Sequence, residues 1–411
     1  MKNTWRKNVA VFLSCQGISL FGSSLVQYAM TWHITLTTRS GVYATVAIIC
    51  GFLPTLLLSP LAGVWADRYS RKLLIMASDG FIALSTLALA IIYLAGFRHI
   101  WLLFVVMALR ALGTAVQMPC VGAILPDITP VEKLTRVNGL NSSLQSLIFL
   151  GSPILAGMLM GLFPLEAIFF IDVITAALAI ALMLLLLRLP AKPAKARQSA
   201  ETWAELRRGF EYVGKQPYLR NFFIFCAAMY FLAAPPAFLT PLQVTRNFGG
   251  DVWRLTAIEV AFAGGMTLGG LLVAVRGGFK NRVHTMGIAF VLLGALNIGL
   301  GLPVSFTLYL AVMAALGLLL PFFNTSATVL LQEKVEPQYL GRVFGVMTMI
   351  SSSMMPLGML LFGPLADVMA IEWLLICAGA GNIAAAALMM RNKPLLEAGK
   401  PGPAADAENC G

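Results

Sequence analysis

The chain has 411 residues, of which 59% are hydrophobic and 11% are charged, and its formal net charge is +11. Soluble globular proteins are roughly 45–50% apolar and about 25% charged, so this chain has too little polar surface for a soluble body of its size. The composition excludes an ordinary soluble domain and favours a protein that faces lipid.

Twelve apolar segments are long enough to cross a membrane as helices, since a hydrocarbon core of roughly 30 Å needs about 20 residues. They are continuously apolar and lack the alternation of a β-barrel. We therefore expect an all-α membrane protein with twelve transmembrane helices. The predicted spans are 9–32, 42–65, 74–96, 101–124, 140–162, 166–188, 218–243, 256–277, 284–303, 305–330, 341–364 and 372–391.

The Lys and Arg residues are distributed unequally between the two sides of this topology. With the N-terminus in the cytoplasm, 24 of the 29 fall on the inner side and 4 in outer loops. The positive-inside rule then predicts that both termini are cytoplasmic, in the inner (plasma) membrane of a bacterium. Attraction to anionic inner-leaflet lipid accounts for the net charge, so no nucleic-acid partner is expected.

The longest polar interruption, residues 189–217, divides the spans six and six. Its second part places Trp203, Leu206, Phe210 and Val213 at helical spacing. This pattern predicts a short amphipathic helix, either on the inner membrane surface or only as part of a linker. The expected organisation is a six-helix bundle at 1–188, a cytoplasmic linker at 189–217, a second six-helix bundle at 218–391 and a disordered cytoplasmic tail at 392–411.

An internal repeat supports this division. The motif "LTRVNG" (134–139) recurs as "LGRVFG" (340–345), and an acid, Asp127 or Glu333, precedes each copy at the end of an apolar run. A helix that contains Pro and Gly follows each copy. Parallel repeats are typical of transporters whose binding site lies at the midplane between two halves.

The stretch "GVWADRYSRK" (63–72) lies in the predicted inner turn between spans two and three. It matches the pattern G-x-x-x-D-R-x-x-R-K/R, with Gly63, Asp67, Arg68, Arg71 and Lys72 at the fixed positions. In this motif and over essentially its whole length, the chain resembles the major facilitator superfamily, which implies a fold of two six-helix bundles.

Other stretches are similar to the macrolide-efflux (Mef) proteins of the drug:proton antiporter branch. They are "GFLPTLLLSPLAGVWADRYSRK", "SLQSLIFLGSP", "AIFFIDV", "QEKVEPQYLGRVF" and the acid in "LTAIEVAFAGGM". This resemblance implies alternating access, export of bulky drugs and proton antiport.

Few ionisable residues lie inside the spans, where a charge is costly and marks a functional candidate. They include Arg110 in span four, Asp172 in span six and Glu259 near the outer start of span eight. We expect the two carboxylates to alternate between proton and substrate, with Arg110 tuning one of them. The alternatives are a structural ion pair for Arg110, and headgroup-zone or helix-end charges for the carboxylates.

The resemblance implies an inner gate around the 63–72 motif. In the family the aspartate at the position of Asp67 faces the inner end of span eleven, near Gly341–Gly345. Arg68 or Arg71 between Asp67 and Asp127 would complete a latch. Asp79 is expected close to the inner surface, as part of the gate electrostatics. The gate set comprises Gly63, Asp67, Arg68, Arg71, Lys72, Asp127 and Arg342.

Polar uncharged residues within the spans offer hydrogen bonds either to a substrate or to neighbouring helices. The substrate-cavity candidates are Gln27, Gln117, Asn141, Gln145 and Asn324. In span five, Gly151, Pro153 and Gly157 favour close packing and bending.

No catalytic or metal-ligating constellation is visible: His33, His99 and His284 lack metal spacing, and no Walker A sequence occurs. We expect neither an enzyme nor an ATP-driven pump, and no cofactor. The expected function is proton-coupled export of amphipathic drugs, macrolides above all, by a monomer. The alternatives are a siderophore or lipid exporter of the same fold, and a membrane receptor or sensor that does not transport.

Overall fold

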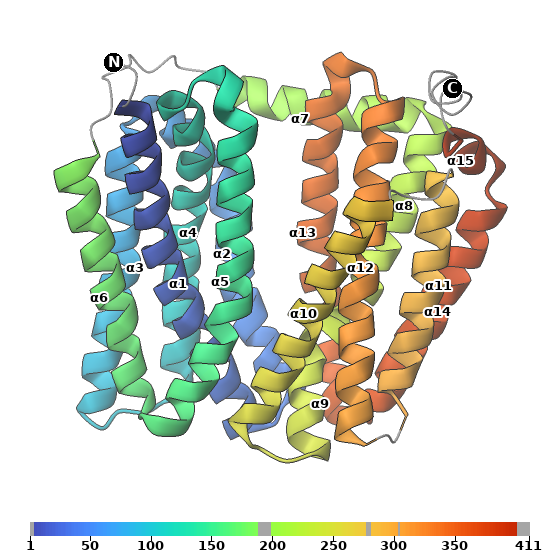
Figure 1. The fold of residues 1–411 in the computed structure, drawn as a ribbon. Helices are drawn as coiled ribbons and strands as arrows, with labels where there is room; N and C mark the ends of the chain where they lie inside the picture. The colour runs from blue at the N-terminus through green and yellow to red at the C-terminus, as the bar shows by residue number, and fades with distance from the viewer. Residues whose placement is uncertain (1–3, 188–198, 277–280, 303–304, 401–411) are drawn as a thin grey trace. The chain divides into compact units, whose positions relative to one another are not determined.

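The computed structural model describes residues 4–187, 199–276, 281–302 and 305–400, and these parts of the chain are almost entirely helical (Figure 1). Twelve helical segments within the described residues are long and apolar enough to cross a membrane. Six of them precede residue 199 and six follow it. The prediction of an all-α protein with twelve spans is confirmed.

The helices of the first half follow the predicted spans closely. They are α1 (Thr4–Thr38), α2 (Gly41–Arg68), α3 (Arg71–Leu94), α4 (Ile100–Ile128), the short turn η1 (Val131–Lys133), α5 (Leu134–Leu162) and α6 (Leu165–Leu186).

The second half adds shorter helices to its six spans. The elements are α7 (Ser199–Lys215), α8 (Pro217–Leu232), η2 (Pro235–Leu239), α9 (Thr240–Asn247), α10 (Val252–Arg276), α11 (Arg282–Leu300), α12 (Phe306–Lys334), α13 (Pro337–Val368), α14 (Ile371–Arg391) and α15 (Lys393–Ala398).

The seventh span is interrupted in its middle. The π-helical turn η2 separates α8 from α9 in the sequence "LAAPPAFLTP". Proline has no backbone N–H and clashes with the carbonyl four residues earlier, so consecutive prolines disrupt the α-helical hydrogen bonds. The wider turn keeps the chain helical across this disruption.

The described chain forms two compact units. Unit 1 comprises Met1–Thr38, Val46–Thr202 and Asp251–Thr256, and unit 2 comprises Arg39–Thr45, Trp203–Gly250 and Ala257–Gly411. The first turns of α2 and α10 therefore belong to the opposite unit from the rest of each helix. The domain boundaries expected from the sequence stay a prediction, and residues 189–198 of the expected linker lie outside the described residues.

Unit 1 is built around α1 and α3. Helix α1 packs against α5 and α6, and α3 packs against α4 and α6. Near the start of α1 these helices bury an apolar cluster that includes Phe12, Ile75 and Ile124. The four helices α1, α3, α4 and α6 also carry the polar side chains described below.

Unit 2 has an apolar core of its own, in which α11 packs against α12 and α14, and α8 packs against α13. Its centre includes Phe222, Phe290 and Phe323, all almost fully buried. The rings of Phe290 and Phe323 have their centroids 4.9 Å apart, within the range of favourable aromatic pairs.

The predicted amphipathic helix is present as α7, and it packs on the start of α13 within unit 2. The ring of Tyr212 stacks on that of Tyr339 at 4.2 Å, and Val213 joins the unit 2 core. Gly209 lies so close to Arg342 that an added Cβ would be 3.2 Å from the Arg342 carbonyl oxygen. Part of the apolar face of α7 therefore packs against the other helices of unit 2.

The structure differs from the expected disordered tail at residues 393–398. These residues form α15, which Asn392 caps by accepting a hydrogen bond from the Leu395 N–H. The side chain of Leu395 is fully buried in the unit 2 core. The helix cap, the buried Leu395 and hydrogen bonds from Asn281 and Arg282 to backbone carbonyl oxygens of Leu396 and Gly399 together hold this segment.

Glycines bring α10 and α12 into direct backbone contact in unit 2. A Cβ added at Gly265 would lie 1.9 Å from the Ala314 carbonyl oxygen, and one at Gly269 would lie 2.1 Å from that of Leu318. A Cβ at Gly317 would lie 2.0 Å from the Phe262 carbonyl oxygen. Small residues spaced four apart let two membrane helices approach this closely.

We therefore expect Gly265→Val to separate α10 from α12 and to destabilise the protein by about 1–3 kcal/mol, as overpacking does elsewhere. The measurement is thermal unfolding of the purified protein in detergent. Gly264→Val is the matched control, because a Cβ at Gly264 meets nothing within 4 Å. Equal losses for the two variants would contradict the close contact and point to helix propensity alone.

Candidate functional site

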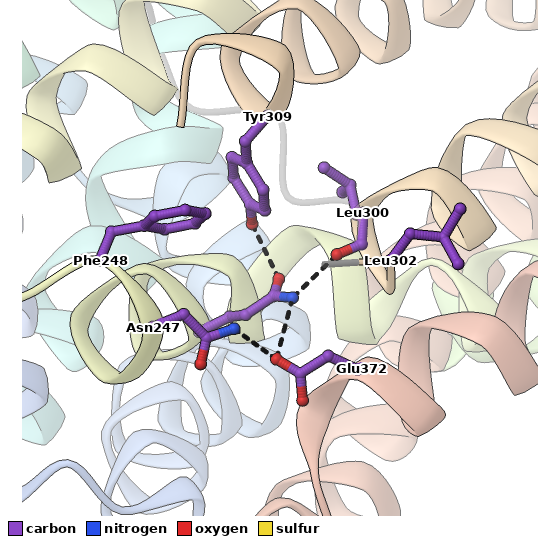
Figure 2. A pocket seen from close by; sticks show the side chains of 7 residues that line it. Asn247, Phe248, Leu300, Leu302, Tyr309 and Glu372 are labelled. Atoms are coloured by element: carbon purple, nitrogen blue, oxygen red, sulfur yellow. Dashed lines mark hydrogen bonds between the residues drawn. The ribbon is translucent and has the colours of Figure 1, made fainter. Parts of the chain in front are cut away.

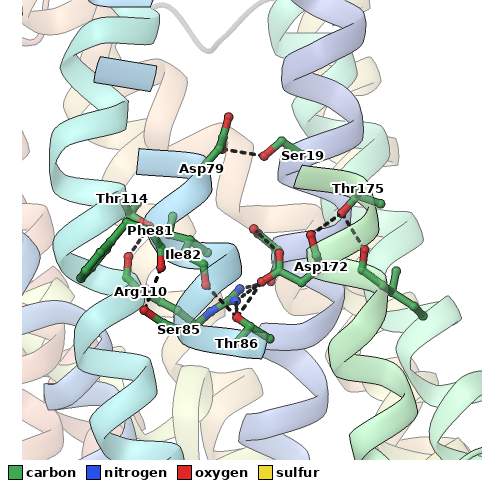
Figure 3. A network of polar contacts seen from close by, with 12 residues as sticks. Ser19, Asp79, Phe81, Ile82, Ser85, Thr86, Arg110, Thr114, Asp172 and Thr175 are labelled. Atoms are coloured by element: carbon green, nitrogen blue, oxygen red, sulfur yellow. Dashed lines mark hydrogen bonds and ion pairs between the residues drawn. The ribbon is translucent and has the colours of Figure 1, made fainter. Parts of the chain in front are cut away.

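A buried ion pair joins two helices of unit 1 (Figure 3). The side chain of Arg110 on α4 is 6% exposed and that of Asp172 on α6 is fully buried, and Arg110 Nη1 pairs with Asp172 Oδ2. The sequence singled out both residues, and the structure brings them together.

Two further helices supply hydrogen bonds to this pair. Thr86 Oγ1 on α3 donates to Asp172 Oδ2 at 2.8 Å, and Ser23 Oγ on α1 donates to Asp172 Oδ1 at 2.7 Å. Arg110 Nη2 donates to the Ser23 carbonyl oxygen at 2.9 Å. A buried ion pair is tolerated only when other hydrogen bonds satisfy its atoms, and Asp172 meets that condition with both oxygens.

Arg110 is less completely satisfied than its partner. Its Nε is buried and has no hydrogen-bond partner within the described part of the chain. The guanidinium therefore keeps one unused donor beside a fully engaged carboxylate, in a region where an unpaired donor is costly.

A second buried carboxylate lies in the same helix cluster. Asp79 on α3 is 3% exposed. Its expected depth, close to the inner surface, stays a prediction, but the burial of its side chain among the helices was not predicted. Ser19 Oγ and Gln117 Nε2 each donate to Asp79 Oδ1 at 2.7 Å. Among the described residues no cation forms an ion pair with Asp79.

A helical-spacing argument could have found this carboxylate. Asp79 precedes Thr86 by seven residues, which is about two turns, so both residues share one face of α3. Gln117 follows Arg110 by the same interval on α4, and Ser19 precedes Ser23 by one turn on α1. Hydropathy alone shows that Asp79 lies near the end of a span, but it does not show which face of the helix carries the side chain.

Glu259 lies on α10 and belongs to unit 2. Its side chain is half-buried and forms no polar contact with any described residue. Of the three predicted coupling candidates, Arg110 and Asp172 thus form one site within unit 1.

The gate motif forms a local ion-pair cluster in unit 1. Arg71 pairs with Asp127, and its guanidinium also donates to the carbonyl oxygens of Ala66 at 3.2 Å and Ala123 at 2.9 Å. Lys72 Nζ donates to the Leu187 carbonyl oxygen at 2.7 Å. Arg71 thereby ties the ends of α2 and α4 to the start of α3, as the sequence suggested for one half of the latch.

Other members of the gate set contribute less to this cluster. Arg68 is exposed, and nothing lies within 4 Å of a Cβ added at Gly63. Arg342 on α13 lies over the Tyr339 ring at 5.6 Å. The side chain of Asp67 lies outside what the structure describes.

The substrate-cavity candidates lie in different environments. Gln117 is committed to Asp79 through its amide nitrogen. Gln27 and Asn141 are half-buried, whereas Gln145 and Asn324 are exposed. The side-chain amides of Gln27, Asn141, Gln145 and Asn324 can bind a ligand only through donors and acceptors that do not already form hydrogen bonds with a neighbouring helix.

The Gly–Pro segment of span five lies inside a continuous helix. Pro153 is within α5, which runs from Leu134 to Leu162. A Cβ added at Gly157 would lie 1.8 Å from Thr256 Oγ1, and one at Gly151 would lie 3.6 Å from the Phe21 ring. Both glycines therefore lie at packed positions of unit 1.

Unit 2 contains a pocket of about 520 Å³ with a mixed polar and apolar lining, supplied by α9, α12, α14 and the end of α11 (Figure 2). Tyr309 Oη donates to Gln243 Oε1 at 2.9 Å, and Gln243 Nε2 donates to the Leu300 carbonyl oxygen at 2.8 Å and to Glu372 at 3.4 Å. Asn247 Nδ2 also donates to Glu372. These groups largely satisfy one another, so the network joins α9, α11, α12 and α14.

The described residues contain no group of three or more His, Cys, Asp or Glu side chains that could hold a metal ion. The chemistry available in the buried site of unit 1 is therefore that of two carboxylates, one guanidinium and neutral hydroxyl and amide donors.

Comparison with known proteins gives the family. The model of the Major Facilitator Superfamily matches residues 9–359. The chain belongs to this superfamily.

Two similar proteins are each named macrolide efflux protein A. The one from Streptococcus pyogenes is 30% identical over 378 residues, which cover 91% of this chain and 93% of that protein. The one from Enterococcus faecalis is 32% identical over 314 residues, which cover 76% of this chain and 97% of that protein.

Among solved structures, a bacterial homologue of the human lysosomal transporter Spinster has the same fold. Its TM-score is 0.72 at 14% identity, and the match covers 98% of this chain and all of that one. The relatives and the fold of this superfamily member are those of membrane transporters rather than enzymes.

Removing one partner of the buried pair should destabilise this transporter strongly. Arg110→Met leaves the Asp172 charge uncompensated and should cost about 3–5 kcal/mol, while the double variant Arg110→Met/Asp172→Asn should recover most of that loss. The measurement is a double-mutant cycle on unfolding in detergent.

The control is the exposed pair Arg207–Glu211 on α7, whose side chains are 83% and 54% exposed. Arg207→Met should change stability by less than about 0.5 kcal/mol. If the double variant at the buried site is as unstable as Arg110→Met alone, the loss does not come from the unpaired charge.

Proposed function

We propose that this transporter exports amphipathic drugs, macrolide-type antibiotics above all, in exchange for protons by alternating access. The single observation that carries the proposal is the Arg110–Asp172 pair, buried at the junction of α1, α3, α4 and α6. It needs no cofactor and uses the proton gradient of a bacterial inner membrane, with both termini in the cytoplasm, and it acts as a monomer.

The pair gives the proposed cycle its chemistry. While Arg110 contacts Asp172, the guanidinium stabilises the ionised carboxylate. When the helices move apart, Asp172 loses its cation and must accept either a proton or a cationic group, because a lone buried charge is too costly. In this proposal Asp172 and Glu259 alternate between proton and substrate, and Arg110 sets which state Asp172 occupies.

The composition supports a bulky apolar substrate. The chain has 20 Met and 25 Phe residues, and flexible Met side chains adapt to ligands of different shape. Arg110 is the single Lys or Arg deep inside a predicted span, which disfavours an anionic siderophore as the substrate. The names of the two macrolide efflux relatives support the same substrate class.

The Arg71–Asp127 cluster supports a role for the 63–72 motif in gating on the side that the charge bias predicts to be cytoplasmic. Arg71 contacts acceptors on both α2 and α4, so it links the ends of these two helices to the start of α3. We place Asp67, Arg68, Lys72 and Arg342 in the same gate, on the resemblance of the motif.

A pH gradient should drive labelled erythromycin into proteoliposomes that contain the purified protein. An acidic lumen should raise uptake above the level at equal pH, and an ionophore that collapses the gradient should abolish the difference. Asp172→Asn should reduce uptake to the level seen without a gradient, because it removes the carboxylate charge that pairs in turn with Arg110, a proton or a cationic group. Gradient-independent behaviour of the unmodified protein would overturn the proposal.

Asp67→Asn should slow erythromycin transport by about two- to fivefold while leaving its binding unchanged. The resemblance implies that Asp67 acts at a helix N-terminus, where a carboxylate contributes about 0.3–1 kcal/mol. Transport rate and equilibrium binding of labelled erythromycin are measured on the same preparation, with Asp67→Glu as the charge-retaining control. Lost binding with a normal transport rate would refute the gating role.

A further inference from the structure

Three helices of unit 1 carry polar side chains at two levels along the same faces (Figure 3). At the first level Ser23, Thr86 and Arg110 surround Asp172. The second level is offset by four residues on α1, or about 6 Å, and by seven residues on α3 and α4, or about 10 Å. There Ser19 and Gln117 surround Asp79.

The two levels differ in charge. Asp172 faces a guanidinium and receives donors on both oxygens. Asp79 receives two neutral donors, both on Oδ1, and no described residue donates to its Oδ2. The first level is therefore neutral with its carboxylate ionised, whereas the second becomes neutral only when Asp79 binds a proton.

The surrounding charges favour a neutral Asp79. Asp172 on α6 adds negative charge to the same cluster, and its own compensating cation, Arg110 on α4, is already paired with it. On α1 the nearby titratable group is the buried thiol of Cys15. On α3 itself Lys72 lies about two turns away and donates to the Leu187 and Leu184 carbonyl oxygens. A carboxylate this deeply buried without a cation is costly to keep ionised.

We propose that Asp79 is a proton-binding site, and that it holds the coupling proton while Arg110 is paired with Asp172. This inference rests on the proposed function for its role in transport. An O–H bond of a hydronium ion breaks as the bond from the proton to Asp79 Oδ2 forms, which leaves a neutral water and a neutral acid. On the other side the Oδ2–H bond breaks again, and a water molecule accepts the proton.

The geometry accommodates both forms of Asp79. Ser19 Oγ and Gln117 Nε2 donate to Oδ1, and a carbonyl oxygen accepts these hydrogen bonds as a carboxylate oxygen does. Proton binding at Oδ2 therefore leaves the described contacts in place. Asp172 lacks this freedom in the same conformation, because both of its oxygens already accept hydrogen bonds.

Infrared titration of the purified protein tests the site without any substrate. A protonated buried carboxyl group gives a carbonyl stretching band. As the pH falls we expect a band component that is missing in Asp79→Asn, while any component from Glu259 remains. This variant keeps an acceptor for Ser19 and Gln117, so it should fold. Glu211→Gln is the control, since Glu211 is exposed on α7, and it should retain the band.

Two results would overturn the proton site. One is a band that persists unchanged in Asp79→Asn. The other is a band that sodium chloride removes at constant pH, with a chloride salt of a large organic cation as control, which would make a metal cation the ligand.

Proteoliposomes test the role in coupling. Asp79→Asn should lose pH-gradient-driven uptake of labelled erythromycin while retaining exchange of labelled for unlabelled erythromycin at equal pH. Gradient-driven uptake at the unmodified rate would refute the coupling role. If the unmodified protein moves no erythromycin, the proposed function fails, whereas the infrared titration still decides whether Asp79 binds a proton.

Discussion

The structure of unit 1 depends on the cost of a charge that is surrounded by apolar side chains. Arg110 and Asp172 lie where water does not reach either side chain freely, so each needs the other together with hydroxyl and carbonyl partners. Those partners come from α1 and α3, and the packing of α1 on α6 and of α3 on α4 and α6 brings them within hydrogen-bonding distance. The ion pair thereby requires α1, α3, α4 and α6 to pack around it.

The two units satisfy their polar groups in different ways. In unit 1 the buried carboxylates Asp172 and Asp79 lie along the helices, at two levels of one cluster, and a third, Glu166, lies at the start of α6 and pairs with Arg98. In unit 2 the described polar network of Gln243, Tyr309 and Glu372 lies at helix ends, and the interior is filled by aromatic rings and glycine-mediated backbone contacts. Titratable chemistry in the described residues is therefore concentrated in unit 1, with Glu259 as a half-buried carboxylate on α10.

The sequence was sufficient to predict features that depend only on the position of residues along the chain. Length and hydropathy predicted all twelve spans, and the scarcity of charge within them pointed to Arg110 and Asp172. It did not predict that Asp79 is buried, because position along a span does not say which helix face a side chain occupies. It also missed α15, since a single buried leucine is invisible in a polar segment. The amphipathic pattern of α7 was read correctly, but its contact with α13 was not predicted.

The sequence by itself determined the class of protein, the number of spans and, through the 63–72 motif and its other resemblances, the superfamily. These follow from the energetics of lipid burial and from local spacing, which act on each segment separately. Only the tertiary structure decided which carboxylate has a cation and which does not. Asp172 and Asp79 are both acids among apolar residues in the sequence, and it is the packing of α4 that gives the first a guanidinium and the second an amide.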